Sequence, residues 1–334
     1  MKKVRWGLVS TANINRKVIP AIRQSRDGVL AAVASREPQA AKAYAKEWEI
    51  GKSFGSYQAM LDSGAVDAVY ISLPNHLHAE WTIKALQAGV HVLCEKPFAL
   101  SLAEVDAMIA ASRQTGKRLA EAFMYRHHPQ TRLLGDWLTS GRLGEIRLVR
   151  GVFNFKLEQS DNVRLTPEFG GGSLWDVGVY PISLAQFVFG APPLRVQGMQ
   201  AIGASGVDED FVGQMSYPGG GLAQIASSFR TPFHTQAEIV GSLGRLQLTR
   251  PFNYLHDPER RMTFFPAGGL AQEIETPTEE LYLGEIEDMH RAILNGAPNL
   301  ISLEQTRDHV RTALALYEAA RTGGSVELAQ ARFA

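Results

Sequence analysis

The chain has 334 residues, of which 45% are hydrophobic and 20% are charged, and its 34 basic residues balance its 34 acidic ones. This length exceeds the size at which one hydrophobic core usually stops growing, so we expect two domains. A formal net charge of zero provides no global field that would draw the chain to nucleic acid or to an anionic membrane, so we expect a small-molecule partner.

Cysteine content and the first residues favour a cytoplasmic location. Cys94 is the only cysteine, which excludes an intramolecular disulfide. The first ten residues lead into a strand pattern without the hydrophobic region of a signal peptide, and no apolar run approaches the ~20 residues that cross a bilayer. Because Cys94 ends an apolar strand, we expect an inert buried thiol rather than a nucleophile.

Strand and helix patterns alternate through the first third of the chain. The predicted strands are 4–9, 30–34, 68–71, 91–94 and 118–122, and the predicted helices are 14–22, 38–48, 76–87 and 102–115. Parallel strands need crossover connections that return over the sheet. The alternation therefore predicts an α/β, Rossmann-type, doubly wound parallel sheet that forms a dinucleotide-binding domain at residues 1–124.

The pattern changes after Tyr125. A predicted helix at 130–139 precedes strand-like segments at 146–155, 196–201, 221–229 and 237–248, and helical patterns return at 279–294 and 303–321. Strands here follow strands through glycine-rich turns. We therefore expect a C-terminal α+β domain with an open, mostly antiparallel sheet at residues 125–334.

The first turn between strand and helix is the candidate phosphate site. Dinucleotide-binding folds use small residues there, so that backbone N–H groups approach a pyrophosphate. The three glycine positions of the usual fingerprint hold Ser10, Ala12 and Asn15, and Asn15 is expected to place the helix slightly further from the sheet. The predicted cofactor-binding residues of this turn are Ser10, Thr11, Ala12, Asn13 and Ile14. The alternative is an ordinary strand–helix turn.

The residues after the second strand bear on the choice of cofactor. NAD enzymes usually carry an acidic residue there, which binds the ribose hydroxyls. Here Ser35 and Arg36 follow the strand, and a hydroxyl and a guanidinium suit a 2′-phosphate. This favours NADP. Glu37 comes next and keeps NAD open, and Arg36 as a solvated surface charge is the other interpretation.

Two short motifs carry candidate catalytic groups. Lys96, in Glu95-Lys96-Pro97, follows a strand where the sheet meets its crevice, and a lysine there orients a hydroxyl group and depresses the pKa of a neighbouring acid. Asp176 and Tyr180 follow a glycine run, and their spacing places them on one face of a helix. The alternatives are an exposed Glu–Lys pair and a structural Asp–Tyr pair.

These motifs resemble the glucose-fructose oxidoreductase, inositol dehydrogenase and rhizopine-catabolism (Gfo/Idh/MocA) family over nearly the whole chain. The motif at 95–97 and the segment Gly170-Gly-Gly-Ser-Leu-Trp-Asp-Val-Gly-Val-Tyr180 carry the resemblance. The segments at 121–129 and 164–172, with tyrosine rather than histidine at 180, are similar to its D-xylose dehydrogenase and dihydrodiol dehydrogenase branch.

The resemblance implies roles for individual residues. Lys96 positions substrate and cofactor, Asp176 orients the substrate, and Tyr180 acts as general acid or base. The residues implied to border the cofactor are Leu73, Pro74, Asn75, His78, Glu95 and Arg126. The resemblance also implies that the second domain binds substrate and forms a homodimer or homotetramer through the exposed face of its sheet.

The expected activity is that of an NADP-dependent aldose 1-dehydrogenase. Lys96 and Asp176 hold the substrate hydroxyl, Tyr180 removes its proton, and hydride passes to the nicotinamide. A vicinal diol or a keto-sugar substrate stays open, as do a sugar–sugar oxidoreductase with tightly bound NADP and a non-catalytic NAD(P) sensor. No metal site is expected, because His76 and His78 would not face one another on a helix.

Overall fold

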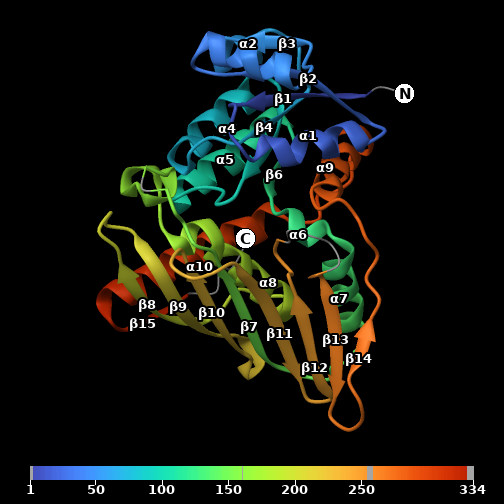
Figure 1. The fold of residues 1–334 in the computed structure, drawn as a ribbon, viewed down its shortest axis with the longest axis vertical. Coiled ribbons are helices and arrows are strands. Elements are labelled where there is room, and N and C mark those ends of the chain that lie inside the picture. The colour runs from blue at the N-terminus through green and yellow to red at the C-terminus, as the bar shows by residue number, and fades with distance from the viewer. Residues whose placement is uncertain (1–2, 160, 254–258, 329–334) are drawn as a thin grey trace. The chain divides into compact units, whose positions relative to one another are not determined.

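The computed structural model describes residues 3–159, 161–253 and 259–328. Its contacts divide the chain into two units (Figure 1). The first unit consists of Met1–His128 and Glu279–Arg307, and the second consists of Pro129–Thr278 and Asp308–Ala334. No helix in the described ranges is both long and apolar enough to cross a membrane.

The first unit contains a six-stranded parallel sheet. Its strand order is β3-β2-β1-β4-β5-β6, with β1 (Val4–Val9), β2 (Gly28–Ala34), β3 (Lys52–Phe54), β4 (Ala68–Ile71), β5 (His91–Glu95) and β6 (Leu119–Ala122). Its helices are α1 (Asn15–Gln24), α2 (Pro38–Glu47), α3 (Tyr57–Asp62), α4 (His78–Gln87), α5 (Leu102–Thr115), α6 (Met124–His127) and α9 (Leu283–Asn295), with a 3₁₀ turn η1 (Asn75–Leu77). The strand order reverses beside β1, which is the usual ligand position in such sheets. The doubly wound sheet is confirmed.

Helix α9 belongs with this first unit, whereas the sequence placed residues 279–307 in the second domain. Trp6, fully buried in β1, donates a hydrogen bond from Nε1 to His290 Nε2 in α9 at 2.8 Å. His290 Nδ1 lies 3.0 Å from Ser25 Oγ, and burial lowers the pKa of this imidazole to about 4. A neutral imidazole satisfies both partners, so these bonds fix α9 against the end of α1.

The second unit contains a nine-stranded sheet that is antiparallel except for the pair β7–β10. Its order is β14-β13-β12-β11-β7-β10-β9-β8-β15, with β7 (Ile146–Asn154), β8 (Arg195–Ile202), β9 (Asp208–Ser216), β10 (Leu222–Ser228), β11 (His234–Gly241), β12 (Gly244–Thr249), β13 (Arg261–Pro266), β14 (Gln272–Ile274) and β15 (Ser325–Glu327). Its helical segments are α7 (Pro129–Thr139), α8 (Val179–Phe189), most of α10 (Leu303–Thr322), the 3₁₀ turns η2 (Val163–Leu165), η3 (Pro167–Phe169) and η5 (Pro218–Gly220), and a π-helical turn η4 (Leu174–Gly178). The predicted open, mostly antiparallel sheet is confirmed.

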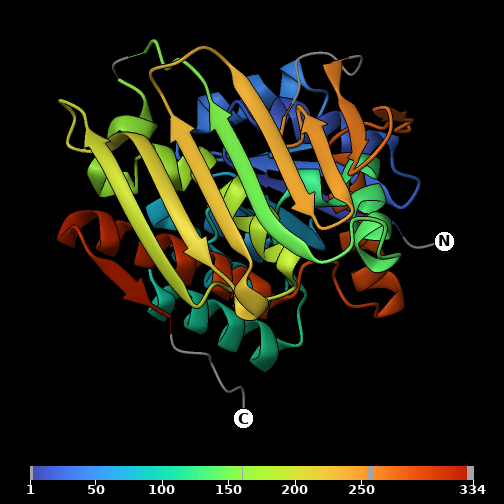
Figure 2. The same cartoon turned by 90° about the horizontal axis from the view of Figure 1, so that it is seen from below.

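The two faces of this sheet differ. Helix α8 packs so closely on β7 that a Cβ atom at Gly151 would lie 2.6 Å from Pro181 Cβ. Figure 2 views the opposite face, on which the strands are not covered by any described helix of this unit. Apolar side chains point outward from it, with Met199 73%, Val212 50% and Leu222 53% exposed.

Candidate functional site

The turn between β1 and α1 is the predicted phosphate site. Ser10 has a positive φ of 122°, and its Oγ accepts a hydrogen bond from Ala12 N–H at 3.1 Å. Within the described residues, the backbone N–H groups of Thr11, Asn13 and Ile14 have no hydrogen-bond partner. Unpaired N–H groups at a helix N-terminus, with its partial positive charge, fit a pyrophosphate. The predicted phosphate turn therefore suits a dinucleotide despite its missing glycines.

Asn15 has a structural role that the sequence reasoning missed. Its side chain is fully buried, and Nδ2 donates to Ser10 O at 2.8 Å while Oδ1 accepts from Ser72 Oγ at 2.7 Å. Ser72, which follows β4, also lies 2.9 Å from Ser10 Oγ. Asn15 thus ties the turn to the neighbouring strand. In the sequence, the one indication of this structural role is that a polar residue occupies a position that normally holds glycine.

Ser35 and Arg36 directly follow β2, at the same edge of the sheet as the predicted phosphate turn. Ser35 is buried and its Oγ accepts from Glu37 N–H at 3.2 Å, whereas Arg36 and Glu37 are exposed. Burial raises the pKa of Tyr57, and the neighbouring Arg36 guanidinium opposes that shift. An exposed guanidinium beside a hydroxyl at this edge can bind a phosphate group by donating hydrogen bonds to its oxygens.

His78 joins two of the predicted site segments. It is fully buried at the start of α4, with Nδ1 2.8 Å from Pro97 O and Nε2 2.8 Å from Leu73 O. Burial lowers the pKa of this imidazole. Both ring nitrogens face backbone carbonyls, so the ring connects the end of β4, where Leu73, Pro74 and Asn75 lie, to the segment that carries Lys96.

Glu95 is the last residue of β5, and Lys96 and Pro97 follow the strand. The Tyr70 hydroxyl donates to Glu95 Oε1, and Lys96 N–H donates to Glu95 Oε2 at 3.1 Å. The Lys96–Pro97 peptide bond is cis. Lys96 is half-buried where β5 ends, and the residue before it carries a carboxylate that Tyr70 and the Lys96 backbone N–H group hold in place.

Two other residues in this unit are too deeply buried for free solvent access. Burial raises the pKa of the Cys94 thiol, which agrees with an inert cysteine. Arg126, in α6, is 4% exposed, and burial lowers its pKa against the opposing effects of Tyr125 and Glu121. Arg126 therefore lies inside the unit, where its contribution to a cofactor site remains a prediction.

The glycine run before Asp176 permits close backbone packing in the second unit. A Cβ atom at Gly171 would lie 2.5 Å from Arg164 O, and one at Gly172, whose φ is +123°, would lie 2.1 Å from Asp208 Oδ1. Only glycine tolerates this conformation and this space. The run thus allows the segment containing η2 and η3 to lie against the start of η4.

Asp208 anchors the π-helical turn and was not recognised from the sequence. It is 2% exposed, and Oδ2 accepts from Ser173 Oγ and Leu174 N–H, both at 2.8 Å. Tyr317 Oη in α10 donates to Oδ1 at 2.7 Å. No sequence spacing links Asp208 to Tyr317, so only the folded structure reveals this network.

Asp176 and Tyr180 occupy different environments within the second unit. Asp176 lies in the π-helical turn, a geometry that is frequent at functional sites, and Arg164 Nε donates to its Oδ2 at 2.6 Å. Tyr180, in the first turn of α8, is 4% exposed, and its ring centroid lies 5.3 Å from that of Phe153 and 5.7 Å from that of Phe252. Lys96 belongs to the first unit. The described side chains contain no group of three or more His, Cys, Asp or Glu residues that is arranged to hold a metal ion.

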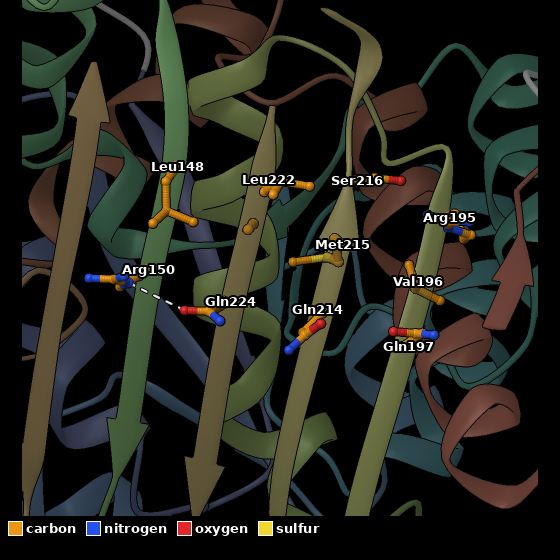
Figure 3. A pocket seen from close by; sticks show the side chains of 11 residues that line it. Leu148, Arg150, Arg195, Val196, Gln197, Gln214, Met215, Ser216, Leu222 and Gln224 are labelled. Atoms are coloured by element: carbon orange, nitrogen blue, oxygen red, sulfur yellow. Dashed lines mark hydrogen bonds between the residues drawn. The ribbon is translucent and has the colours of Figure 1, made fainter. Parts of the chain in front are cut away.

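A shallow pocket of about 260 Å³ lies on the uncovered face of the nine-stranded sheet (Figure 3). Its polar lining comes from neighbouring strands, where Arg150 Nε donates to Gln224 Oε1 at 3.3 Å. Arg150 and Arg195 are the ionisable side chains among the residues that line it. A lining without an acid or a base does not provide proton-transfer chemistry.

Family models and relatives agree with this arrangement. A model described as "Oxidoreductase family, NAD-binding Rossmann fold" matches residues 4–123, and one described as "GFO/IDH/MocA C-terminal domain" matches residues 131–247. A D-xylose 1-dehydrogenase (NADP(+)) from Haloferax volcanii is 37% identical over 325 residues, which covers 97% of this chain and 99% of the relative.

Two solved structures share the fold over nearly their whole length. Aldose-aldose oxidoreductase from Caulobacter crescentus, complexed with glycerol, has a TM-score of 0.91 and 26% identity and covers 98% of this chain and 100% of its own. A 3-ketoreductase from Actinomadura kijaniata, in complex with NADP and TDP-benzene, has a TM-score of 0.89 and 29% identity. The match covers 95% of this chain and 98% of the reductase chain. Since the family models match residues in both units and the relative spans almost the whole chain, this chain belongs to the GFO/IDH/MocA oxidoreductase family.

Proposed function

We propose that the chain is an NADP-dependent dehydrogenase that oxidises an aldose at its anomeric carbon to a lactone. The observation that carries this proposal is the placement of Lys96 at the carboxyl end of β5, next in the chain to a carboxylate fixed by Tyr70, in a Rossmann unit whose first turn has backbone N–H groups without a partner among the described residues. The similarity to a D-xylose 1-dehydrogenase over 97% of the chain supports an aldose as substrate.

NADP is the proposed cofactor. The N–H groups of Thr11, Asn13 and Ile14 would hold its pyrophosphate, and Ser35 and Arg36 would hold its 2′-phosphate. The segments that contain Asn75 and Glu95 lie at the carboxyl ends of β4 and β5, where the nicotinamide half of a dinucleotide binds in such sheets. The bound nicotinamide would supply the hydride acceptor.

The protein's own groups would bind the sugar and move one proton. Lys96 and Asp176 hold the anomeric hydroxyl, which fixes the reacting carbon in place. Tyr180 takes the hydroxyl proton on its phenol oxygen. The phenolate is the form that accepts this proton, and because a phenol has an ordinary pKa of about 10, a positive charge favours that form.

Homo-oligomers would form through the uncovered face of the nine-stranded sheet. Met199, Val212 and Leu222 expose apolar side chains there, and exposed apolar side chains on one face of a sheet favour an interaction site. A homodimer or homotetramer would cover this face with the same face of a second copy.

The direct test is the appearance of reduced nicotinamide when the purified protein is mixed with NADP, and separately with NAD, across a panel of aldoses, inositols and diols. We expect turnover with NADP and an aldose, and a decrease of about 10²- to 10⁴-fold in kcat for Lys96→Ala and Tyr180→Phe. Lys84→Ala and Tyr217→Phe, which change an exposed lysine and a buried tyrosine elsewhere, serve as matched controls and should keep full activity.

Absence of turnover with every substrate would contradict the dehydrogenase proposal. If the protein then co-purifies with nicotinamide and exchanges hydride between two aldoses, it is a sugar–sugar oxidoreductase, an activity that the name of the Caulobacter crescentus relative suggests. Binding of NADP without any hydride transfer would point to a sensor.

A further inference from the structure

Arg164 is a charged residue that the proposed mechanism does not use. It lies in η2, twelve positions before Asp176, and forms an ion pair with that carboxylate through Nε at 2.6 Å. The Asp176 side chain is 13% exposed and the Arg164 side chain is 41% exposed. The pair therefore reaches the surface of the unit on the arginine side, while the carboxylate is largely enclosed.

The backbone around Arg164 is fixed on both sides. Arg164 N–H donates to Asn162 Oδ1 at 3.1 Å, and Gly172 N–H donates to Arg164 O at 2.9 Å. The close approach of Gly171 to Arg164 O leaves no space for a Cβ atom. The glycine run therefore holds the arginine at one position relative to the π-helical turn.

The guanidinium group contacts Asp176 from this fixed position. Nη1 also lies 3.4 Å from Asn162 Oδ1, so the plane of the group is held by a second contact. A carboxylate that accepts a hydrogen bond from a guanidinium stays ionised and keeps one orientation. An ionised carboxylate in one orientation is a better acceptor for sugar hydroxyl groups than a mobile one, because less side-chain entropy is lost on binding.

We propose that Arg164 is a positioning residue for sugar binding, which acts by holding the Asp176 carboxylate ionised and oriented toward the substrate hydroxyls. The inference rests on the proposed function, because Asp176 is the group that would orient the sugar. It assigns the ion pair to substrate affinity rather than to the proton transfer at Tyr180. Its loss should therefore raise KM for the sugar much more than it lowers kcat.

The experiment measures sugar binding directly, by titration calorimetry of D-xylose and D-glucose into the full-length protein loaded with NADPH, which cannot accept hydride from the sugar. We expect Arg164→Gln to weaken sugar binding about tenfold or more and to leave NADP binding and the melting temperature unchanged, with Arg164→Lys intermediate. Arg245→Gln breaks a comparable ion pair, with Glu238, and serves as the matched control that keeps sugar affinity.

Two further readouts separate positioning from a structural role. In an Asp176→Asn background, Arg164→Gln should have no further effect on sugar affinity, because its action passes through the carboxylate. Millimolar guanidinium ion should restore part of the sugar affinity of Arg164→Ala and none of that of Asp176→Asn. A purely structural arginine would give additive losses and no rescue.

The possible failures are distinguishable. If the wild-type protein binds the sugars and Arg164→Gln binds them equally well, or if the two substitutions are additive, the inference about Arg164 is wrong and the proposed function stands. If the wild-type protein binds none of the sugars, both the inference and the proposed function fail.

Discussion

Glu285 is a carboxyl group buried in the first unit without any hydrogen-bond partner in the described part of the chain. It is 1% exposed, and both carboxyl oxygens are unpaired. Burial raises its pKa well above the ordinary value, and the carboxylates of Glu95, Glu280 and Asp288 add to the effect. The side chain therefore favours its protonated form in the folded state.

This buried carboxyl predicts a pH-dependent effect of Glu285→Gln. Above the unfolded pKa of about 4.3, the native state keeps a proton that the unfolded state has lost, so wild-type stability falls as pH rises toward the raised folded value. Glutamine carries no proton to lose, so the stability of Glu285→Gln relative to wild type should increase by about 1.4 kcal/mol per pH unit in that window. Urea denaturation from about pH 4 to pH 8 measures this difference. A difference that does not change with pH contradicts the raised pKa, and Glu47→Gln, at an exposed ion pair, is the control.

Asn15 shows what sequence reasoning achieves at single residues. The position of the phosphate turn was predictable from the strand–helix pattern, and so were Ser35, Arg36 and Lys96, because each directly follows a strand. The role of Asn15 was not, because its amide pairs with Ser72, fifty-seven residues away. The local sequence does not show which distant residue a side chain will bind, so a role of this kind cannot be predicted from it.

At the scale of elements, the glycine run and the π-helical turn form one assembly. Gly172 brings the backbone against Asp208, and Asp208 binds the first residues of η4. The sequence indicated a glycine run opening a helix, which the structure contains. The π-helical geometry was not predictable, because it depends on a carboxylate from β9.

Gly172→Ala should therefore destabilise the second unit far more than a substitution at an ordinary helix-ending glycine. The new methyl group would lie 2.1 Å from Asp208 Oδ1 in a residue with positive φ, so we expect a loss of roughly 3 kcal/mol or more in the free energy of unfolding. Gly190, which follows α8, has φ +66° and open space around it, so Gly190→Ala should cost only about 1 kcal/mol. Denaturant titration of both variants tests this, and equal losses would show that backbone conformation alone matters.

Two short elements of the first unit escaped the sequence patterns. Strand β3 has three residues and α3 has six, and neither is long enough to show a clear periodicity. Ser56 nevertheless caps α3, since its Oγ accepts from Ala59 N–H at 3.1 Å. Ser56 was a possible helix-capping residue in the sequence. It could be recognised as one only once the short strand β3 before it was known.

At the scale of the molecule, the chain enters its first unit twice. The helical pattern of α9 was visible in the sequence, but its packing against β1 and α1 was not, because Trp6 and His290 are 284 positions apart. The general division into a Rossmann domain and a second α+β domain follows from local alternation. Residues 279–307 belong to the first unit because they contact residues far away in the sequence, and local sequence patterns do not show such contacts.

The uncovered sheet face predicts how the protein assembles. Val212 and Leu222 expose about half of their surface on adjacent strands, β9 and β10, so a lysine at either position would place a charge in any interface formed there. We expect the wild-type protein to run as a dimer or tetramer, and Val212→Lys to weaken that association by tenfold or more, because an unpaired charge is costly to bury.

The measurement is size-exclusion chromatography with light scattering over a range of protein concentrations. Leu270→Lys changes an 88% exposed leucine outside this sheet face and should leave the oligomer intact. Circular dichroism of Val212→Lys should match that of the wild-type protein, because the side chain points away from the helices of its unit. If Val212→Lys forms the same oligomer as the wild-type protein, the subunits associate through another surface, and the apolar side chains on this face need a different partner.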